Sequence, residues 1–204
     1  MDLLVATHNP GKMREFRALL ASLPAQILFP PDLGLMVEVV EDGATYVENA
    51  RIKAEAYVRA IGGRDGIAPL VLADDSGLEV DALGGAPGIH SARYTSGSDT
   101  DRLSALLARL EEVPWERRTA RFRCVVVIVT PRGDLHIAEG SCEGVIATEP
   151  AGEGGFGYDP LFYLPEFGCT MAELPVRAKN QISHRARAVR AALPLLRRLL
   201  AAGG

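Results

Sequence analysis

Lysine is rare in this 204-residue chain, and its three occurrences lie in short polar clusters. They are Lys12 in T-H-N-P-G-K, Lys53 in E-N-A-R-I-K-A and Lys179 in A-K-N-Q-I-S-H-R. A compact ammonium suits a point contact to a phosphate, whereas a guanidinium presents a planar fork. One interpretation is that the three lysines serve a single anionic ligand. The other is an arginine-biased composition with three lysines left over, and the lysine pattern alone favours neither.

The first cluster lies between an apolar run and a segment with helical spacing. A helix N-terminus offers backbone N–H groups and the positive end of a dipole, which suits a phosphate. The glycine spacing is not that of a Walker loop, and an ordinary strand–turn–helix remains the alternative. The residues of this candidate loop are Thr7, His8, Asn9, Pro10, Gly11 and Lys12.

The second and third clusters supply a lysine and a pair of acids. Asn49 and Lys53 are four residues apart and therefore share a helix face. Asp74 and Asp75 follow a buried apolar run, where two adjacent carboxylates are costly without a hard cation, a basic partner or water. The alternatives are a solvated polar helix face and an acidic strand end.

The fourth cluster is rich in glycine and aromatic residues. A glycine-flanked aromatic pair can stack on a flat ring, and the nearby Arg185 can donate to a ring carbonyl. A turn with two core aromatics, followed by a helix start, is the alternative. The cluster contains Phe156, Gly157, Tyr158 and Asp159, followed by Lys179, Ser183, His184 and Arg185.

Hydrophobic periodicity predicts the elements that must position these clusters. Helices are expected after Gly11, over residues 45–61 and 99–112, and after Ser183, with Pro194 interrupting the last. Strands are expected over residues 2–6, 26–29, 70–73 and 120–130, and residues 135–142 are expected to pair back as a hairpin. Strands and helices mix without strict alternation, which predicts an α/β fold with a mixed sheet.

The composition argues against several classes of protein function. A net charge of −4 with no long run of one sign argues against a nucleic-acid coat or a membrane-surface protein. The three cysteines are far apart and form no C-x-x-C pair, which indicates neither a zinc site nor a disulfide framework and favours a cytoplasmic protein. The N-terminal segment lacks the features of a signal peptide, and no stretch reaches membrane-span length.

Taken together, the order and spacing of the clusters resemble a known family. The motifs are T-x-N-x-G-K-x-x-E, G-x-T-Y-x-E-N-A-x-x-K-A, A-D-D-S-G-L-x-V-D-A-L-G-G-x-P-G-x-x-S-A-R-Y, G-G-F-G-Y-D-P-x-F and K-x-x-I-S-H-R. They resemble the inosine/xanthosine triphosphate pyrophosphatases of the HAM1 or RdgB type, over nearly the whole chain. The resemblance implies one domain over residues 1–204, with a long mixed sheet flanked by helices and two lobes around an active-site cleft.

The resemblance also implies an activity and its residues. The expected reaction is hydrolysis of ITP, dITP and XTP to the monophosphate and pyrophosphate with Mg²⁺, in a homodimer that binds neither nucleic acid nor membrane. The loop from Thr7 to Lys12 would hold the triphosphate with Lys53, and Asp75 would be the catalytic residue at the metal. The substrate would further contact Ser76, Phe156, Gly157, Tyr158, Asp159, Lys179, His184 and Arg185.

One position departs from the family pattern. Members often carry a metal-binding glutamate three residues before the glycine of the G-x-T-[FY] motif, and here that position is Val40, followed by Glu41. Either Glu41 takes the role, or Asp74, Asp75 and water hold the metal. A Maf-type pyrophosphatase with another base preference and a non-catalytic nucleotide-binding module are the rival hypotheses.

Overall fold

The computed structural model describes residues 1–62 and 69–202, which contain a seven-stranded sheet of order β2-β1-β3-β4-β5-β6-β7. Strand β1 is parallel to both β2 and β3, whereas β6 is antiparallel to β5 and β7. The predicted α/β fold with a mixed sheet is therefore confirmed. The strands are β1 (Leu3–Val5), β2 (Ile27–Leu28), β3 (Leu70–Val80), β4 (Thr119–Val129), β5 (Leu135–Ile146), β6 (Phe162–Leu164) and β7 (Cys169–Thr170).

Five α-helices and several short 3-10 turns accompany the strands in the described ranges. The first three helices begin within two residues of the predicted starts, and side chains of Asn9, Thr45 and Ser98 cap their N-termini. The helices are α1 (Pro10–Leu20), α2 (Tyr46–Ile61), α3 (Asp99–Arg109), α4 (Val176–Ile182) and α5 (His184–Ala202). No helix in the described part of the chain is both long and apolar enough to cross a membrane.

The chain divides into two compact units, each assembled from separate stretches of sequence. Unit 1 comprises residues 1–75, 124–140 and 186–204, and unit 2 comprises residues 76–123 and 141–185. Strands β3, β4 and β5 each contribute residues to both units. The expected single domain with two lobes and a cleft between them stays a prediction.

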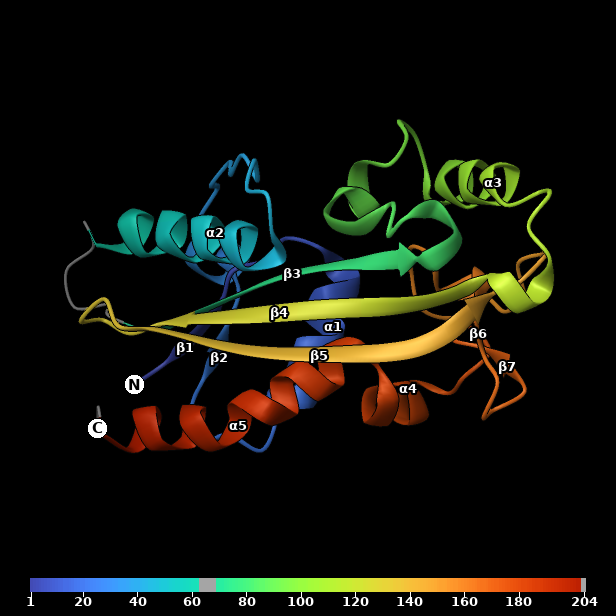
Figure 1. Cartoon of the computed structure of the whole chain (residues 1–204). Helices are drawn as coiled ribbons and strands as arrows, with labels where there is room; N and C mark the ends of the chain where they lie inside the picture. Colours follow the sequence, from blue (N-terminus) through green and yellow to red (C-terminus); the bar gives the residue numbers. More distant parts are fainter. Residues whose placement is uncertain (63–68, 203–204) are drawn as a thin grey trace. The chain divides into compact units, whose positions relative to one another are not determined.

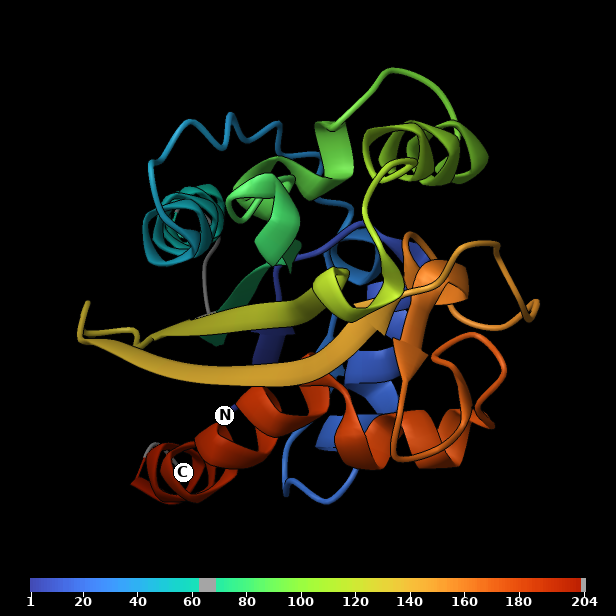
Figure 2. The same cartoon turned by 45° about the vertical axis from the view of Figure 1, so that its right-hand side comes forward.

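Unit 1 is built on alternating apolar residues of its strands. In this unit α1 and α5 lie on one face of the strands and α2 lies on the other (Figures 1 and 2). Side chains of β1, β3 and β4 alternate between the two faces. The core on the α1 and α5 side includes Leu3, Val5, Phe16, Leu20, Leu70, Leu72, Val126, Val189 and Leu196.

Unit 2 has its own apolar core, between α3, the remaining strand segments and the turn before β6. Its buried members include Leu78, Val80, Leu103, Leu106, Phe122, Ile146, Tyr158, Phe162 and Met171. The rings of Phe122 and Phe162 lie 4.4 Å apart between centroids. The core holds Tyr158, a predicted substrate residue, so part of the fourth cluster also serves packing.

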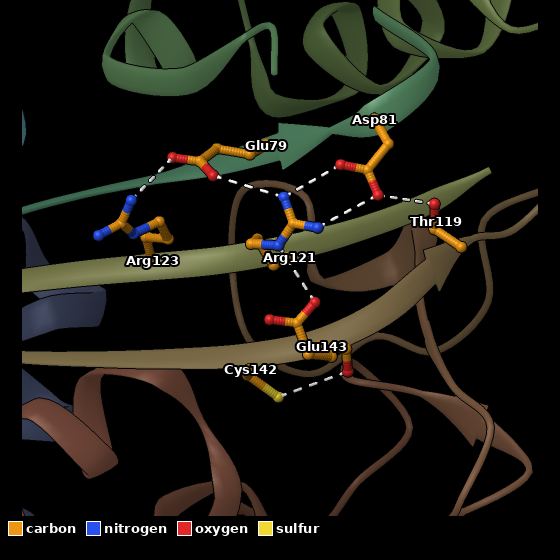
Figure 3. A network of polar contacts seen from close by, with 7 residues as sticks. All are labelled: Glu79, Asp81, Thr119, Arg121, Arg123, Cys142 and Glu143. Carbon is orange, nitrogen blue, oxygen red and sulfur yellow. Dashed lines mark hydrogen bonds and ion pairs between the residues drawn. The ribbon is translucent and has the colours of Figure 1, made fainter. Parts of the chain in front are cut away.

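A charged network on unit 2 explains why β4 begins with alternating residues. Arg121 donates to both carboxylate oxygens of Asp81 at 3.0 and 3.2 Å and to Glu143 at 3.2 Å (Figure 3). Arg123 and Arg121 both reach Glu79. The hydrogen bonds from Thr119 and Arg121 lower the pKa of Asp81. Ala120 and Phe122 face the core instead.

The boundary expected for β3 was wrong, and one helix was missed. Strand β3 does not end at Ala73 but continues to Val80, because Leu78 and Val80 belong to the core of unit 2. Asp74 and Asp75 therefore lie within a strand rather than at its end. Helix α4 was not predicted, and α5 continues through Pro194, as the expected stripe on both sides of it implied. Burial of Val189, Ala192 and Leu196 on both sides of Pro194 outweighs its cost to the helix.

The Arg118 side chain hydrogen-bonds to three separate backbone segments near the connection from α3 to β4. The side chain is buried, with the residue 6% exposed, and its guanidinium donates to three backbone carbonyls of unit 2. The acceptors are Val113 O at 2.9 Å, Leu110 O at 2.7 Å and Ala147 O at 3.3 Å. A single side chain thus satisfies carbonyls from a helix end, a loop and a strand end.

We expect Arg118→Met to lower the free energy of unfolding by about 2–4 kcal/mol, because it leaves several buried carbonyls without donors. Urea denaturation monitored by circular dichroism measures this change. Arg117→Met is the matched control, because Arg117 is the exposed neighbour of the same residue type. Equal stability of the two variants would contradict the assigned role of Arg118.

Candidate active site

The predicted phosphate loop joins β1 to α1 in unit 1. Thr7 and Gly11 are buried, whereas His8, Asn9 and Pro10 are exposed. The Asn9 side chain accepts the Lys12 N–H at 3.0 Å, and Thr7 Oγ1 accepts the Asn9 N–H at 3.2 Å. One first-turn amide is therefore already bonded, so the anion-binding capacity of this helix end depends chiefly on the Lys12 ammonium and the helix dipole.

Two of the three lysines converge on the aspartate pair within unit 1. Lys12 Nζ lies 3.0 Å from Asp74 Oδ2, and the Asp74 side chain is 1% exposed. Lys53 Nζ donates to the Asp74 carbonyl at 2.8 Å and pairs with Glu41 Oε1 at 2.9 Å. A buried carboxylate requires such a partner, because desolvation penalises an isolated charge. The structure thus places Lys12 and Lys53 with Asp74 and Glu41.

Asp75 lies on the opposite side of β3 from Asp74 and is held by α2. Asn49, which is fully buried, donates through Nδ2 to Asp75 Oδ2 at 3.1 Å and accepts the Gly43 N–H at 2.8 Å. Burial raises the pKa of Asp75; Lys53, Asn49 and Lys12 lower it in part, and Glu41 adds to the rise. Asp75 is therefore a carboxylate with a shifted affinity for protons, as functional sites often show.

The backbone at Gly43 packs so closely against α2 that the position requires glycine. A Cβ atom on Gly43 would lie 2.7 Å from Glu48 Cβ and 2.9 Å from Asn49 Oδ1. Any other residue would push the loop away from α2. This loop carries Glu41 as well, so the contact helps to keep the Glu41 carboxylate near Lys53.

The oxygen donors of unit 1 fit a hard divalent cation such as Mg²⁺. No group of three or more His, Cys, Asp or Glu side chains is arranged for a metal ion within residues 1–62 and 69–202. Mg²⁺ usually binds through one or two protein carboxylates and keeps water and substrate phosphates as its other ligands. Asp75 and Glu41 are carboxylates of this kind, and both are near Lys53, which pairs with Glu41 at 2.9 Å and acts electrostatically on Asp75. Asp74 and Glu41 each pair with a lysine, so either carboxylate would have to exchange that lysine for the cation.

The predicted nucleoside residues gather in unit 2 around residues 154–159, which we call the aromatic loop. Asp159 Oδ2 accepts the Phe156 N–H at 2.8 Å and the Lys179 ammonium at 2.6 Å. Gly155 has φ of +74°, and a Cβ there would lie 2.0 Å from Asp159 Oδ2. The tight turn thus requires glycine at this position.

Phe156 lies among cations. Lys179 Nζ lies 4.9 Å and Arg185 Cζ lies 5.7 Å from the centroid of the Phe156 ring. The Arg185 residue is 1% exposed and donates to Ser76 Oγ at 2.9 Å. Ring faces attract cations, so these contacts hold the two basic groups beside the aromatic surface. The third lysine therefore belongs to a different group of residues from Lys12 and Lys53.

Other residues support the aromatic loop and were missed by sequence reasoning. The His184 ring stacks on Phe122 at 4.7 Å between centroids, and the Tyr158 hydroxyl donates to the Ser91 carbonyl at 3.0 Å. Burial raises the pKa of Tyr158 well above its usual range. Asp99 contacts the Gly157 amide. Ser91 lies in the S-A-R-Y motif, but the apolar context of Phe122 and the helix-start position of Asp99 gave no signal of these contacts.

Comparison with known proteins identifies the family of this chain. The model of the Ham1 family matches residues 3–195. The chain belongs to the Ham1 family. A dITP/XTP pyrophosphatase of Desulforamulus reducens is 51% identical over 98% of this chain and 97% of its own length. One from Geobacillus kaustophilus is 49% identical over 92% and 90% of the two chains.

Solved structures of Ham1-family members agree with the fold. A HAM1 protein from Coxiella burnetii superposes with a TM-score of 0.83 at 36% identity, covering 97% of this chain and 99% of its own. A nucleoside-triphosphatase, dITP/XTP pyrophosphatase, from Mycobacterium abscessus gives 0.73 at 42% identity, with 95% and 100% coverage. These values confirm the family resemblance deduced from the motifs.

The buried contacts of Asn49 lead to a stability prediction. Asn49→Ala should lower the free energy of unfolding by about 1–3 kcal/mol, because the Gly43 amide and the Asp75 carboxylate lose a buried partner. Chemical denaturation measures the loss. Arg51→Ala is the control on the same helix, because its exposed ion pair with Glu55 contributes little. A loss no larger than in the Arg51 variant would refute the importance of these contacts.

Proposed function

We propose that this Ham1-family enzyme hydrolyses dITP, ITP and XTP to the nucleoside monophosphate and pyrophosphate. The observation that carries the proposal is the similarity, over nearly the full length at about half identity, to proteins named dITP/XTP pyrophosphatases. The buried acidic and basic groups of unit 1 and the cation-flanked aromatic ring of unit 2 supply chemistry that this reaction needs. Removal of such nucleotides would cleanse the nucleotide pool.

The residues of unit 1 are suited to the triphosphate. Lys12 and Lys53 would exchange their carboxylate and carbonyl partners for phosphate oxygens and offset the charge of the leaving pyrophosphate. Asp75 would orient or deprotonate the water that attacks the α-phosphorus. A divalent cation held by Asp75 and Glu41, for which Mg²⁺ is our proposal, would stabilise negative charge on the phosphates.

The residues of unit 2 are suited to the base. Phe156 offers a ring for stacking, and Lys179 and Arg185 are close to its surface. Hypoxanthine and xanthine carry a carbonyl at C6, where adenine carries an amino group. Arg185 has only donors, so it favours the carbonyl and disfavours the amine. Guanine shares that carbonyl and must be rejected at its 2-amino group.

Several associated properties are part of the same proposal. We propose a homodimer that acts in the cytoplasm on small nucleotides, without nucleic acid or membrane as a partner. The modest net charge of −4 and the absence of a long basic run support this assignment.

The proposal is tested by incubating the purified protein and Mg²⁺ with ITP, dITP, XTP, GTP, ATP and dTTP and measuring pyrophosphate. We expect release from ITP, dITP and XTP well above that from ATP and GTP. Preferential release from a pyrimidine or modified nucleotide would favour a Maf-type activity instead. Binding without release from any nucleotide would favour a non-catalytic module.

Asp75→Asn provides the matched inactive variant for this assay. The substitution preserves size and removes the charge, so we expect pyrophosphate release to fall by about two orders of magnitude or more with the fold retained. Circular dichroism checks the fold. Full activity in this variant would remove Asp75 from its proposed role.

Base selectivity depends on Arg185 in this proposal. Arg185→Ala should reduce the ratio of kcat/KM for ITP over ATP by about tenfold or more, because the charged donor that discriminates at C6 is lost. Arg187→Ala is the control, since Arg187 is exposed on the same helix. An unchanged ratio in the Arg185 variant would refute the selectivity argument.

A further inference from the structure

The aromatic loop is tied to its own unit at several points. The Gly154 amide donates to Ala172 O at 3.0 Å, Asp159 pairs with Lys179 at 2.6 Å, and the Tyr158 hydroxyl reaches Ser91 O at 3.0 Å. These ties hold both ends of the loop. The peptide between Phe156 and Gly157 has its carbonyl bonded to the Asp159 N–H at 3.3 Å within the loop, while its N–H takes its support from outside the loop.

Asp99 provides that support from the first turn of α3. Its Oδ2 accepts the Gly157 N–H at 2.8 Å, although the two residues are 58 positions apart in the chain. The carboxylate also pairs with Arg102, which in turn donates to Gly97 O at 3.2 Å. Burial opposes ionisation of Asp99, but the bonds from Gly157 and Arg102 prevail and lower its pKa.

Asp99 is not needed to cap its own helix. Ser98 is the N-cap and accepts the Asp101 N–H, while Asp101 accepts the Ser98 N–H at 2.6 Å to complete a capping box. Asp99 is therefore available to bond outward, and its 2.8 Å contact to the Gly157 N–H has the length of a well-formed hydrogen bond.

We propose that Asp99 is a positioning residue that fixes the Phe156–Gly157 peptide and so orients the Phe156 ring for the base of the substrate. The inference rests on the proposed function, in which Phe156 stacks on a purine. Loss of the contact leaves this peptide held through the longer 3.3 Å bond from the Asp159 N–H, so that ordering the ring on binding costs more free energy. The effect falls on substrate affinity rather than on the chemical step at Asp75.

Three variants separate this role from a merely structural one. Asp99→Ala removes the acceptor, and Asp99→Asn keeps an oxygen that can accept the Gly157 N–H. Asp101→Ala is the matched control, because it removes an acid from the same helical turn without touching the aromatic loop. Thermal unfolding reports any global loss of stability, which we expect to be no larger in the Asp99 variants than in Asp101→Ala.

Hydrogen–deuterium exchange tests the contact without any substrate. Peptides that cover residues 154–159 should exchange faster in Asp99→Ala than in the wild type. Exchange in Asp99→Asn and Asp101→Ala should stay close to wild type in the same peptides. Equal exchange in Asp99→Ala and the wild type would overturn the proposal.

Steady-state kinetics with XTP and dITP then tests the consequence. We expect KM to rise by about tenfold in Asp99→Ala, which corresponds to about 1.4 kcal/mol, with kcat within about twofold of wild type. Asp99→Asn should restore most of the KM. An unchanged KM, or an equal rise in Asp101→Ala, would overturn the positioning role.

Failure of the proposed function would look different. In that case the wild type itself would release no pyrophosphate from XTP or dITP, and the exchange experiment alone would decide whether Asp99 holds the loop. If the wild type is active but Asp99→Ala changes neither the exchange of the loop nor the KM, only the role of Asp99 is rejected.

Discussion

Charge balance around two adjacent aspartates is the constraint on which the rest of unit 1 depends. Asp74 and Asp75 are both buried in β3, where unpaired carboxylates would be strongly unfavourable. Lys12 from the start of α1 pairs with Asp74, and Asn49 from α2 bonds to Asp75. Both helices, through the side chains that they carry, therefore satisfy these two groups in addition to packing on the strands.

A balanced interior of this kind has two uses. It allows carboxylates to persist in a buried strand, and it keeps ammonium groups close by that can turn to an incoming polyanion. The lysines therefore stabilise the protein alone and would serve the ligand in the complex. Since Lys179 pairs with Asp159 in unit 2, the same arrangement occurs there. The choice of lysine over arginine suits a group that must change partners, because its flexible stem is not confined to a planar fork.

The sequence predicted those elements whose apolar spacing was regular. The stripes of α1, α2 and α3 and the apolar run of β4 were sufficient, because local pattern and tertiary burial agree there. The second half of β3 was not predicted, because the residues D-D-S-G favour turns. The strand continues through them because Leu78 and Val80 are buried in the core of unit 2.

The motifs identified residues of the candidate site, but they did not identify the residues that these contact. Lys53 and Asp75 were recognised, but their contacts with Glu41 and Asn49 required coordinates. Asp99 was hidden because an acid at a helix start is already explained by the helix dipole. Phe122 was hidden because an aromatic residue in an apolar strand is already explained by the core. A residue with one sufficient local explanation gives no sequence signal of a second role.

The alternation of side chains along β3 gives the aspartate pair a directional meaning. Asp74 and Asp75 are chemically identical neighbours, yet Asp74 pairs with Lys12 of α1 and Asp75 bonds to Asn49 of α2. A single-residue deletion between Leu70 and Ala73 would preserve the letters of the motif and exchange the faces of everything after it. The two acids therefore cannot replace each other, and the number of residues between them and the start of the strand is part of the motif.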